Sequence, residues 1–562
     1  NLVRTTADAG GGTVRLETTT GTFGSTGNNP RLFFTQINGT APTTTNLIGG
    51  WAFLSNAYGS PNPSYHWAAY DTTAGVGVKP STYTNIGAVN FTPNSTNIVN
   101  LNASGTATLE DSSTNKHEML ALRFGADADQ TLTFADLTND VLYIGSGGIL
   151  AENYNRSRYI GTSGSGTRGT ITAGPSSGAT GTQELFFHIP QGTTYVYSTI
   201  TDNGSAPVAL VKDLGGTVQL EATNNTYSGG TYLYGGRINA TKPGSLGTGP
   251  VLVKGGALQL NAAGATSSTA GIRVIDGSEL YLASNIAYNQ TGDRFYIEAG
   301  STITAYHTSS TAGFASLTRV YTWPATADGQ VYLEPGAIVR IPSGSILHGD
   351  IMTNMIKNLG TDADLFFNQT GDGSPLQYIT VGAGTPWKGL SSSVGEGWVQ
   401  GTIYANSDFW LQGHYRLGSA VALNLGRPST SNPNTGSYAI INQAGRPINV
   451  FVSGQVVLNE DTPVQMSGDI TFVITSDGYL QPNWANSFGD LERFGSRAKV
   501  LVQAGGTLDP GNYVPIYPYQ DSPDYPAYYG KQYPLPSPVN TDVVVEAGGR
   551  FLINDASGIG ST

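Results

Sequence analysis

The sequence predicts an all-β protein whose chain winds into a solenoid of about 20 residues per coil. Gly supplies 75 of the 562 residues, and Gly and Thr are poor in helix interiors, whereas Thr, Tyr and Val suit strands. Charged residues make up 12% of the chain, about half the usual share of roughly 25%. The most specific observation is a Gly-Gly pair that returns every 20 residues, at Gly215 and Gly216, Gly235 and Gly236, and Gly255 and Gly256.

Each of these pairs is followed by alternating apolar and polar residues, as in Thr217-Val218-Gln219-Leu220. Such alternation is typical of a strand with one buried face. A fixed period of about 20 residues indicates a solenoid, in which each coil buries its apolar face against its neighbours. Gly suits the corners of the coils because it accepts positive φ and lets successive corners stack closely. We expect about three short strands in each coil.

The same pattern, in looser form, divides the rest of the chain. We expect a β-helix with repeats over residues 1–300, clearest over 208–260, and a less regular continuation with insertions over 301–512. Residues 513–541 form an inserted loop, and residues 542–562 a final coil.

The inserted loop is rich in Tyr and Pro, and Pro removes the hydrogen-bond donors that a central strand needs. One interpretation is an ordered loop lying along one face of the solenoid. The other is an adhesive or interface surface, which its tyrosines would form: Tyr513, Tyr517, Tyr519, Tyr525, Tyr528, Tyr529 and Tyr533.

Composition excludes several classes of partner. A net charge of −12 and a pI near 4.9 argue against nucleic acid, which requires clustered Lys and Arg. No apolar run approaches the roughly 18 residues of a membrane-spanning helix. The chain has no Cys, so disulfides and thiolate metal sites are excluded.

No residue pattern points to catalysis, and we expect no catalytic residue and no cofactor. The acidic pairs Asp127 and Asp129, and Asp362 and Asp364, stand two positions apart and share a face of a strand. They are a weak candidate for calcium, and solvated turns are the simpler interpretation. The six His residues are scattered, with no two at the spacing of zinc ligands.

The middle of the chain resembles a known family. The segments that carry the resemblance are Leu210-Val211-Lys212, Gly216-Thr217-Val218-Gln219-Leu220, Asn225-Thr226-Tyr227-Ser228-Gly229-Gly230-Thr231 and Leu246-Gly247-Thr248-Gly249. They are similar to the autotransporter-associated β-strand repeat of exported passenger proteins. Flanking segments such as Ile48-Gly49-Gly50-Trp51 and His66-Trp67-Ala68 resemble large verrucomicrobial and planctomycete surface repeat proteins. The resemblance implies a right-handed parallel β-helix displayed on the surface of a bacterial cell with a Gram-negative-type envelope, and it implies no catalytic activity.

Three functions remain open. The first is a non-catalytic subunit of an extracellular fibre, sheath or surface layer, whose partner is another copy of itself. It is suggested by the lack of an amphipathic capping helix at either end of the chain, since uncapped strand edges pair readily. The second is an adhesin that binds surface glycans through the tyrosines of 513–541 and through exposed Trp51, Trp67, Trp387 and Trp398. The third is a polysaccharide lyase or hydrolase on a β-helix scaffold.

Overall fold

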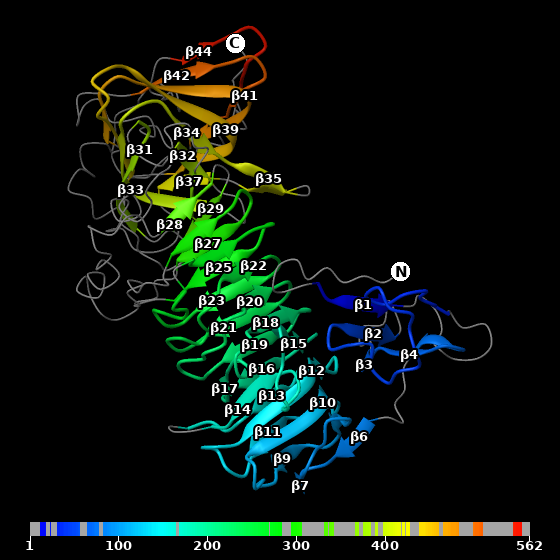
Figure 1. The fold of residues 1–562 in the computed structure, drawn as a ribbon. Helices are drawn as coiled ribbons and strands as arrows, with labels where there is room; N and C mark the ends of the chain where they lie inside the picture. Colours follow the sequence, from blue (N-terminus) through cyan, green and yellow to red (C-terminus); the bar gives the residue numbers. More distant parts are fainter. Residues whose placement is uncertain are drawn as a thin grey trace. The chain divides into compact units, whose positions relative to one another are not determined.

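The fold of the chain is seen in a computed structural model (Figure 1). It describes residues 12–17, 23, 31–56, 64–77, 83–164, 168–268, 270–283, 294–305, 331–334, 337–341, 366–369, 375–383, 388–391, 397–416, 419–421, 423–426, 438–459, 465–482, 498–509 and 543–552. The described residues form strands, turns and bends, with no helix among them. The chain divides into two compact units, Asn1–Ser301 with Thr322–Pro324 and Thr302–Tyr321 with Ala325–Thr562. The expectation of an all-β protein is confirmed.

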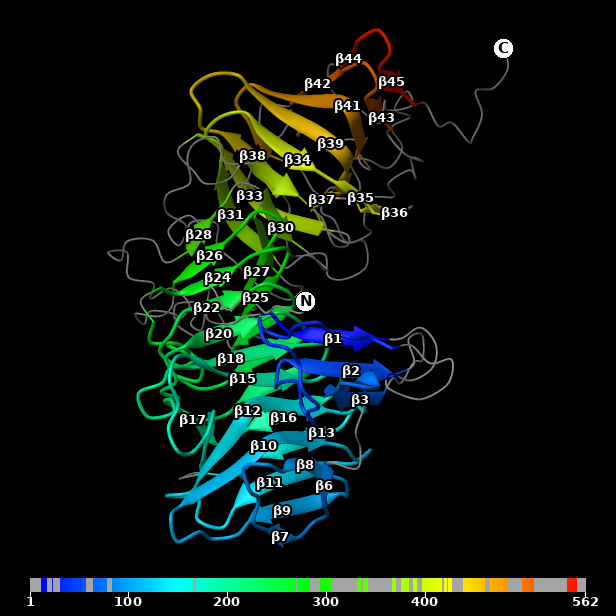
Figure 2. The ribbon, with the colours of Figure 1, turned by 45° about the vertical axis from the view of Figure 1, so that its right-hand side comes forward.

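Unit 1 contains two long parallel sheets, seen from a second side in Figure 2. In spatial order, sheet 1 consists of β6 (Tyr83–Ile86), β8 (Ile98–Leu101), β10 (Lys116–Phe124), β12 (Val141–Ala151), β15 (Gln183–His188), β18 (Val208–Asp213), β20 (Gly230–Leu233), β22 (Val251–Val253), β24 (Ile272–Val274) and β26 (Phe295–Ile297). Two short strands extend it beside β12, namely β14 (Thr170–Ala173) and β17 (Thr199–Ile200). Sheet 2 consists of β7 (Asn90–Phe91), β9 (Gly105–Leu109), β11 (Gln130–Phe134), β13 (Ser157–Ile160), β16 (Thr193–Val196), β19 (Thr217–Leu220), β21 (Arg237–Ala240), β23 (Ala257–Leu260) and β25 (Glu279–Leu282).

The chain alternates between the two sheets, so that each coil adds one strand to each. Thr217 pairs with Arg237, which pairs with Ala257, so the register repeats the period of 20 residues. The expectation of about three strands per coil is met where β14 and β17 add a third strand, as in the coils β14-β15-β16 and β17-β18-β19. It is wrong for the coils that follow, because their third side is a ladder of single hydrogen bonds between turns. Leu246 N donates to Ala265 O at 2.7 Å in this ladder.

Inward-facing side chains of successive coils stack into an apolar core. Leu220, Ala240 and Leu260 are fully buried and lie in register on β19, β21 and β23. A stack of aliphatic side chains at the strand spacing buries its apolar surface continuously from coil to coil.

The corner glycines allow this stacking. Gly236 has φ +70°, and a Cβ there would lie 2.3 Å from the carbonyl oxygens of both Gly216 and Leu214. Gly256 repeats the arrangement one coil later, where a Cβ would lie 2.2 Å from Gly236 O. No side chain larger than hydrogen fits these corners without a shift of the main chain.

The described residues between 12 and 77 form a separate N-terminal module. Its three-stranded sheet has the order β1 (Val14–Glu17), β2 (Ala52–Asn56) and β3 (Ser64–Trp67), with β2 and β3 antiparallel. A small antiparallel pair follows, β4 (Ala69–Asp71) and β5 (Gly75–Gly77).

The module packs on the outer face of sheet 1, where its apolar residues join two hydrophobic clusters with residues of β8, β10, β12, β15, β18 and β20. Trp51 and Trp67 are only 7% and 1% exposed as a result. The expectation that these two tryptophans are exposed for stacking on glycans is therefore wrong. Trp387 lies outside the described residues.

Unit 2 is also built of parallel ladders. Its strands are β27 (Thr302–Ala305), β28 (Val331–Leu333), β29 (Ile338–Ile341), β30 (Phe366–Gln369), β31 (Pro375–Val381), β32 (Gly389–Ser391), β33 (Gly397–Ala405), β34 (Phe409–Gln412), β35 (His414–Arg416), β36 (Ser419–Val421), β37 (Leu423–Gly426), β38 (Tyr438–Asn442), β39 (Ile448–Asn459), β40 (Gln465–Ser467), β41 (Ile470–Pro482), β42 (Lys499–Val502), β43 (Thr507–Leu508), β44 (Val543–Val545) and β45 (Arg550–Phe551). The longest pairing joins β39 to β41 in parallel, with an irregularity between Val452 and Gly454. Only β35 and β36 pair antiparallel among its described strands. Trp398 stands in β33, and the tyrosines of 513–541 lie outside the described residues.

Candidate functional site

A row of side chains, all polar except Leu150, lies on the outer face of sheet 1, beneath the N-terminal module. The register of β6, β8, β10, β12, β15 and β18 places these residues side by side: Asn85, Asn100, Arg123, Leu150, His188 and Asp213. Arg123, His188 and Asp213 are at most 6% exposed. Charged groups at such depth must be paired or hydrogen-bonded, and their partners include the main chain of the module.

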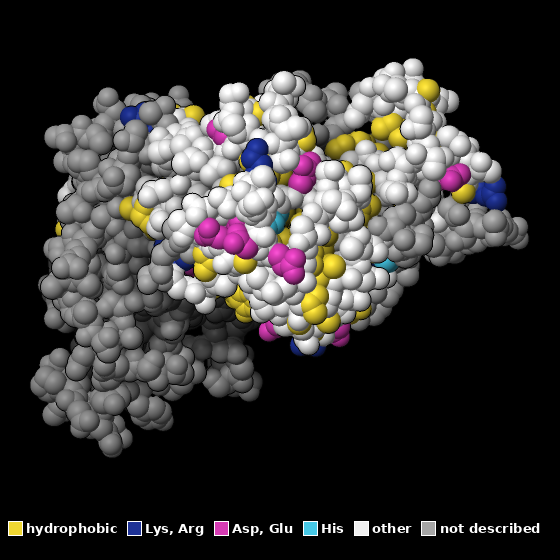
Figure 3. Space-filling model, turned by 60° about the horizontal axis from the view of Figure 1, so that its bottom comes forward, with side chains coloured by type: hydrophobic (Ala, Val, Ile, Leu, Met, Phe, Trp, Pro, Cys, Tyr) yellow, Lys and Arg dark blue, Asp and Glu magenta, His cyan; other side chains and the backbone are white. Residues whose placement is uncertain are grey.

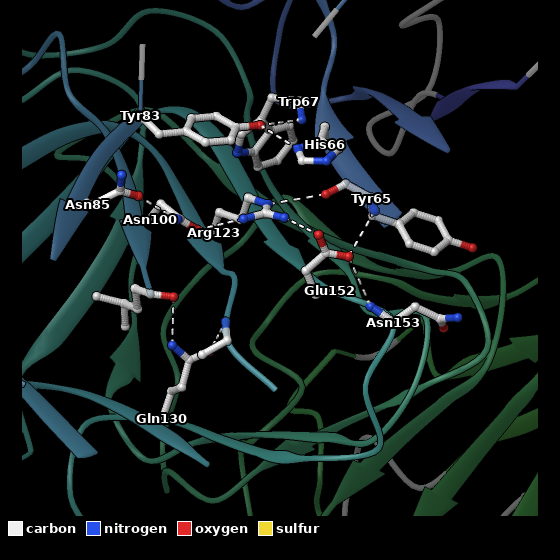
Figure 4. Close-up of polar contacts among 12 residues, drawn as sticks. Tyr65, His66, Trp67, Tyr83, Asn85, Asn100, Arg123, Gln130, Glu152 and Asn153 are labelled. Carbon is white, nitrogen blue, oxygen red and sulfur yellow. Dashed lines mark hydrogen bonds and ion pairs between the residues drawn. The ribbon is translucent and has the colours of Figure 1, made fainter. Parts of the chain in front are cut away.

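Arg123 and Glu152 hold the main chain of β3 (Figure 4). The guanidinium of Arg123 pairs with the carboxylate of Glu152 and donates from Nη1 to Asn100 Oδ1 at 2.7 Å. Its Nε donates to Tyr65 O at 3.2 Å, while Tyr65 N donates to Glu152 Oε2 at 2.9 Å. The pair therefore satisfies both main-chain groups of Tyr65, as a neighbouring strand would.

Tyr83 bonds to a further main-chain group of β3, two residues beyond Tyr65. Trp67 N donates to Tyr83 Oη at 3.1 Å, and Tyr83 Oη lies 3.5 Å from His66 Nδ1. Burial and, after it, the nearby charge of Arg123 lower the pKa of His66 to about 4. His66 is therefore neutral at neutral pH, and the unfolded chain binds a proton more readily than the folded chain between pH 4 and 6.5.

His188 and Asp213 make the second polar contact with the module. His188 Nδ1 lies 2.7 Å from Asp213 Oδ1, and His188 Nε2 lies 2.7 Å from Gly50 O. Burial raises the pKa of the Asp213 carboxyl, but the charge of His188 and hydrogen bonds from His188 and Thr13 outweigh it and leave the pKa below its ordinary value.

Two glycines allow the module to approach sheet 1 closely. A Cβ on Gly148 would lie 2.5 Å from Trp67 Cη2 and 2.9 Å from Gly50 Cα. A Cβ on Gly50 would lie 2.2 Å from Ser146 O. The module is thus fitted against the backbone of β12 itself.

Two further cations lie inside the coils and hold carbonyl groups at the corners. Lys212 is fully buried, and its Nζ donates to the carbonyl oxygens of Asp213, Leu214 and Gly235. Arg158, also fully buried, donates to Gln191 O at 2.9 Å, among other main-chain carbonyls. Burial lowers the pKa of Lys212 to about 7 and that of Arg158 to about 10. These side chains bind the protein's own main chain, which is a structural role.

The depressed pKa of Lys212 predicts a stability that rises with pH. Between pH 7 and 10.5 the unfolded chain keeps a proton that the folded chain has lost. The free energy of unfolding should therefore increase by about 2 kcal/mol from pH 7 to pH 9 through this one group. Equilibrium unfolding in guanidinium at the two pH values measures the increase. In Lys212→Met, the increase in the free energy of unfolding should be smaller by the contribution of Lys212. An equal pH dependence in the variant would contradict the prediction.

The candidate calcium ligands are engaged by the protein itself. Asp127 Oδ1 accepts from Arg156 Nε at 2.8 Å, and Asp129 Oδ1 accepts from Ser157 N at 2.9 Å. Asp362 and Asp364 lie outside the described residues. Within the described ranges, no group of three or more His, Asp or Glu side chains is placed to hold a metal ion.

The outer face of sheet 2 carries a ladder of aromatic and carboxamide side chains. In register these are Tyr159, Tyr195, Gln219, Asn239, Gln259 and Tyr281. The rings of Tyr159 and Tyr195 stack with centroids 5.1 Å apart and planes 16° apart. Their faces are turned toward each other rather than toward solvent, so this ladder stabilises the sheet and offers no open aromatic platform.

The first coil of unit 1 leaves two strand edges open. Among the described strands, β6 pairs with β8 alone and β7 with β9 alone. Val89, which immediately precedes β7, is 54% exposed. Figure 3 turns the side of the molecule nearest β7 forward and shows scattered apolar and acidic side chains, with fewer basic ones.

The last described coil of unit 2 also has strands that are paired on one side only. Of the described strands, β44 pairs with β42 and β45 with β43, each on one side. Val544 and Val545 are 60% and 42% exposed. Three of the five exposed large hydrophobic residues in the described part of the chain therefore stand at these two coils, the others being Phe33 and Tyr296.

Among the described residues no helix is long and apolar enough to cross a membrane. Comparison of the chain with protein-family models, with curated proteins and with solved structures finds no match.

Proposed function

We propose that the chain is a right-handed parallel β-helix and serves as a non-catalytic, exported structural subunit that associates with further copies of itself. The alternation of parallel strands between sheets 1 and 2 supports the helix, and parallel strands joined by a crossover are almost always connected with a right-handed turn. The resemblance of residues 208–260 to exported repeat proteins supports display at a bacterial cell surface.

The observation that carries self-association is the open strand edge at β6 and β7, with exposed Val89 beside it. Unpaired donors and acceptors at a strand edge are a template for another strand, and proteins that stay monomeric usually cover them or place charges there. The first coil, residues 83–94, contains no charged residue. Val544 and Val545, which stand in β44, are exposed at a second strand edge.

The use of the charged residues supports a structural rather than a catalytic role. Arg123, Glu152, His188 and Lys212 each bond to main-chain atoms of the protein. Groups that hold the backbone in this way stabilise a scaffold.

A charge at the open edge tests the proposal. Val89→Lys should abolish concentration-dependent association of the purified chain in sedimentation velocity, because a lysine at a strand edge opposes pairing. Thr106→Lys is the matched control, since it adds the same charge to an exposed position of β9 that already has strands on both sides. The control should associate like the unmodified protein. A single monomeric species of the unmodified chain at every concentration would overturn the proposal.

A further inference from the structure

The side chain of His188 is placed between two hydrogen-bond acceptors. Its Nδ1 faces the carboxylate of Asp213 and its Nε2 faces the carbonyl oxygen of Gly50, each at 2.7 Å. A neutral imidazole has one N–H donor and one lone pair, whereas the imidazolium has two donors. Both contacts are therefore hydrogen bonds only when His188 carries two protons.

The groups around the ring leave Asp213 as its charged partner. Phe53 and Trp67 of the module and Phe186 of β15 pack on it, with ring centroids 4.5, 5.7 and 5.8 Å away. Arg123 and Glu152 pair with each other, and Leu150 separates Arg123 from His188 in the register of sheet 1. Lys212, next to Asp213 in sequence, donates to corner carbonyls, and its charge also acts on the Asp213 carboxylate.

The two acceptors belong to different parts of unit 1. Asp213 ends β18 of sheet 1, while Gly50 precedes β2 of the N-terminal module. His188 is fully buried, so water cannot replace a lost partner at low cost. The protonation state of one ring thus affects the attachment of the module to the sheet.

We propose that His188 is a proton-dependent latch that holds the N-terminal module against sheet 1 and releases it when the ring loses a proton. Deprotonation turns a lone pair toward Gly50 O or Asp213 Oδ1, so that one of the two hydrogen bonds is lost, and it removes one of the two positive charges that act on the buried Asp213 carboxylate. The attachment of the module to sheet 1 should therefore weaken at alkaline pH.

The second histidine of this interface responds in the opposite sense. His66 in β3 is neutral when docked, with its pKa lowered to about 4 by burial and by Arg123. Its protonation in acid opposes docking below pH 6.5, progressively down to about pH 4. The module is consequently held most tightly between the two transitions.

Hydrogen exchange of the full chain, followed by mass spectrometry from pH 5.5 to pH 9 and corrected for intrinsic exchange rates, tests the latch. Protection of peptides covering β2 and β3 should fall about tenfold or more from neutral to alkaline pH, the expected effect of losing a buried charged hydrogen bond. Peptides of β19 and β21 in sheet 2 should not lose protection over the same range.

Two variants separate the latch from general effects of pH. In His188→Gln, the β2 and β3 peptides should have low protection already at neutral pH and show no further alkaline loss. His117→Gln is the control, because His117 is a buried histidine that lies 3.1 Å from a different carboxylate, Asp140, and it should keep the wild-type response. Unchanged protection of β2 and β3 in the wild type, or an alkaline loss retained in His188→Gln, would overturn the proposal. If His188→Gln does not fold, the wild-type pH series decides.

Discussion

Arg123→Met is expected to lower the free energy of unfolding of unit 1 by about 3–5 kcal/mol, the usual cost of removing one partner of a buried ion pair. The loss is large because Glu152 is only 6% exposed and would keep its charge without a counter-ion. Tyr65 O would lose its donor at the same time. Guanidinium unfolding followed by tryptophan fluorescence measures the effect, since Trp51 and Trp67 are buried in the interface between the module and the sheet.

Two further variants decide whether burial is the cause. Arg156→Met removes a similar pair with Asp127, but these side chains are 46% and 57% exposed, so its loss of stability should be small beside that of Arg123→Met. Adding Glu152→Gln to Arg123→Met removes the stranded charge and keeps an acceptor for Tyr65 N, so the double variant should recover much of the lost stability. Equal small losses for Arg123→Met and Arg156→Met would contradict the account.

Gly236→Ala is expected to destabilise the coils by about 3 kcal/mol or more, which exceeds the usual range for a single surface substitution. The new Cβ would lie 2.3 Å from the carbonyl oxygens of Gly216 and Leu214, both of them main-chain atoms of the preceding coil. Neither can move without disturbing the register of β19 and β21, which are paired next to this corner.

Gly300→Ala separates the steric effect from the conformational one. Gly300 has φ +76°, close to the +70° of Gly236, but a Cβ there would meet nothing within 4 Å. It should cost only the free energy of placing an L-residue in the left-handed region, about 1–2 kcal/mol. Thermal unfolding by circular dichroism compares the two. Similar midpoints would show that the corners do not need to stack closely.

The repeated part of the fold was predictable because its signals are local. The Gly-Gly spacing and the alternation after each pair predict strands at β19, β21 and β23, where the structure has them. The third side was predicted where β14 and β17 form it. It was mispredicted in the later coils, because turns can also stack by single hydrogen bonds, as Leu246 N does to Ala265 O.

The N-terminal module was not distinguished from the coils. Gly12-Thr13-Val14 resembles the start of a coil, and β1 alternates as a coil strand does. Alternation shows that one face is buried, but it does not show which strand lies alongside. The antiparallel pairing of β2 with β3 could therefore not be predicted from the repeat period of the sequence.

The polar row beneath the module was missed for a related reason. His188 and Asp213 are 25 residues apart in sequence and meet through the register of β15 and β18. One usable signal was present: Leu185-Phe186-Phe187-His188 and Val211-Lys212-Asp213 place charged or titratable groups directly after apolar residues of a strand. Such residues in a buried strand require partners, although the sequence does not say which.

Electron microscopy of the purified chain in negative stain, over a range of concentrations, tests the proposed self-association most directly. The account predicts particles that join through their strand edges into chains or layers, and predicts separate particles for Val89→Lys under the same conditions. Separate particles of the unmodified protein at every concentration, or assemblies that Val89→Lys leaves intact, would contradict it.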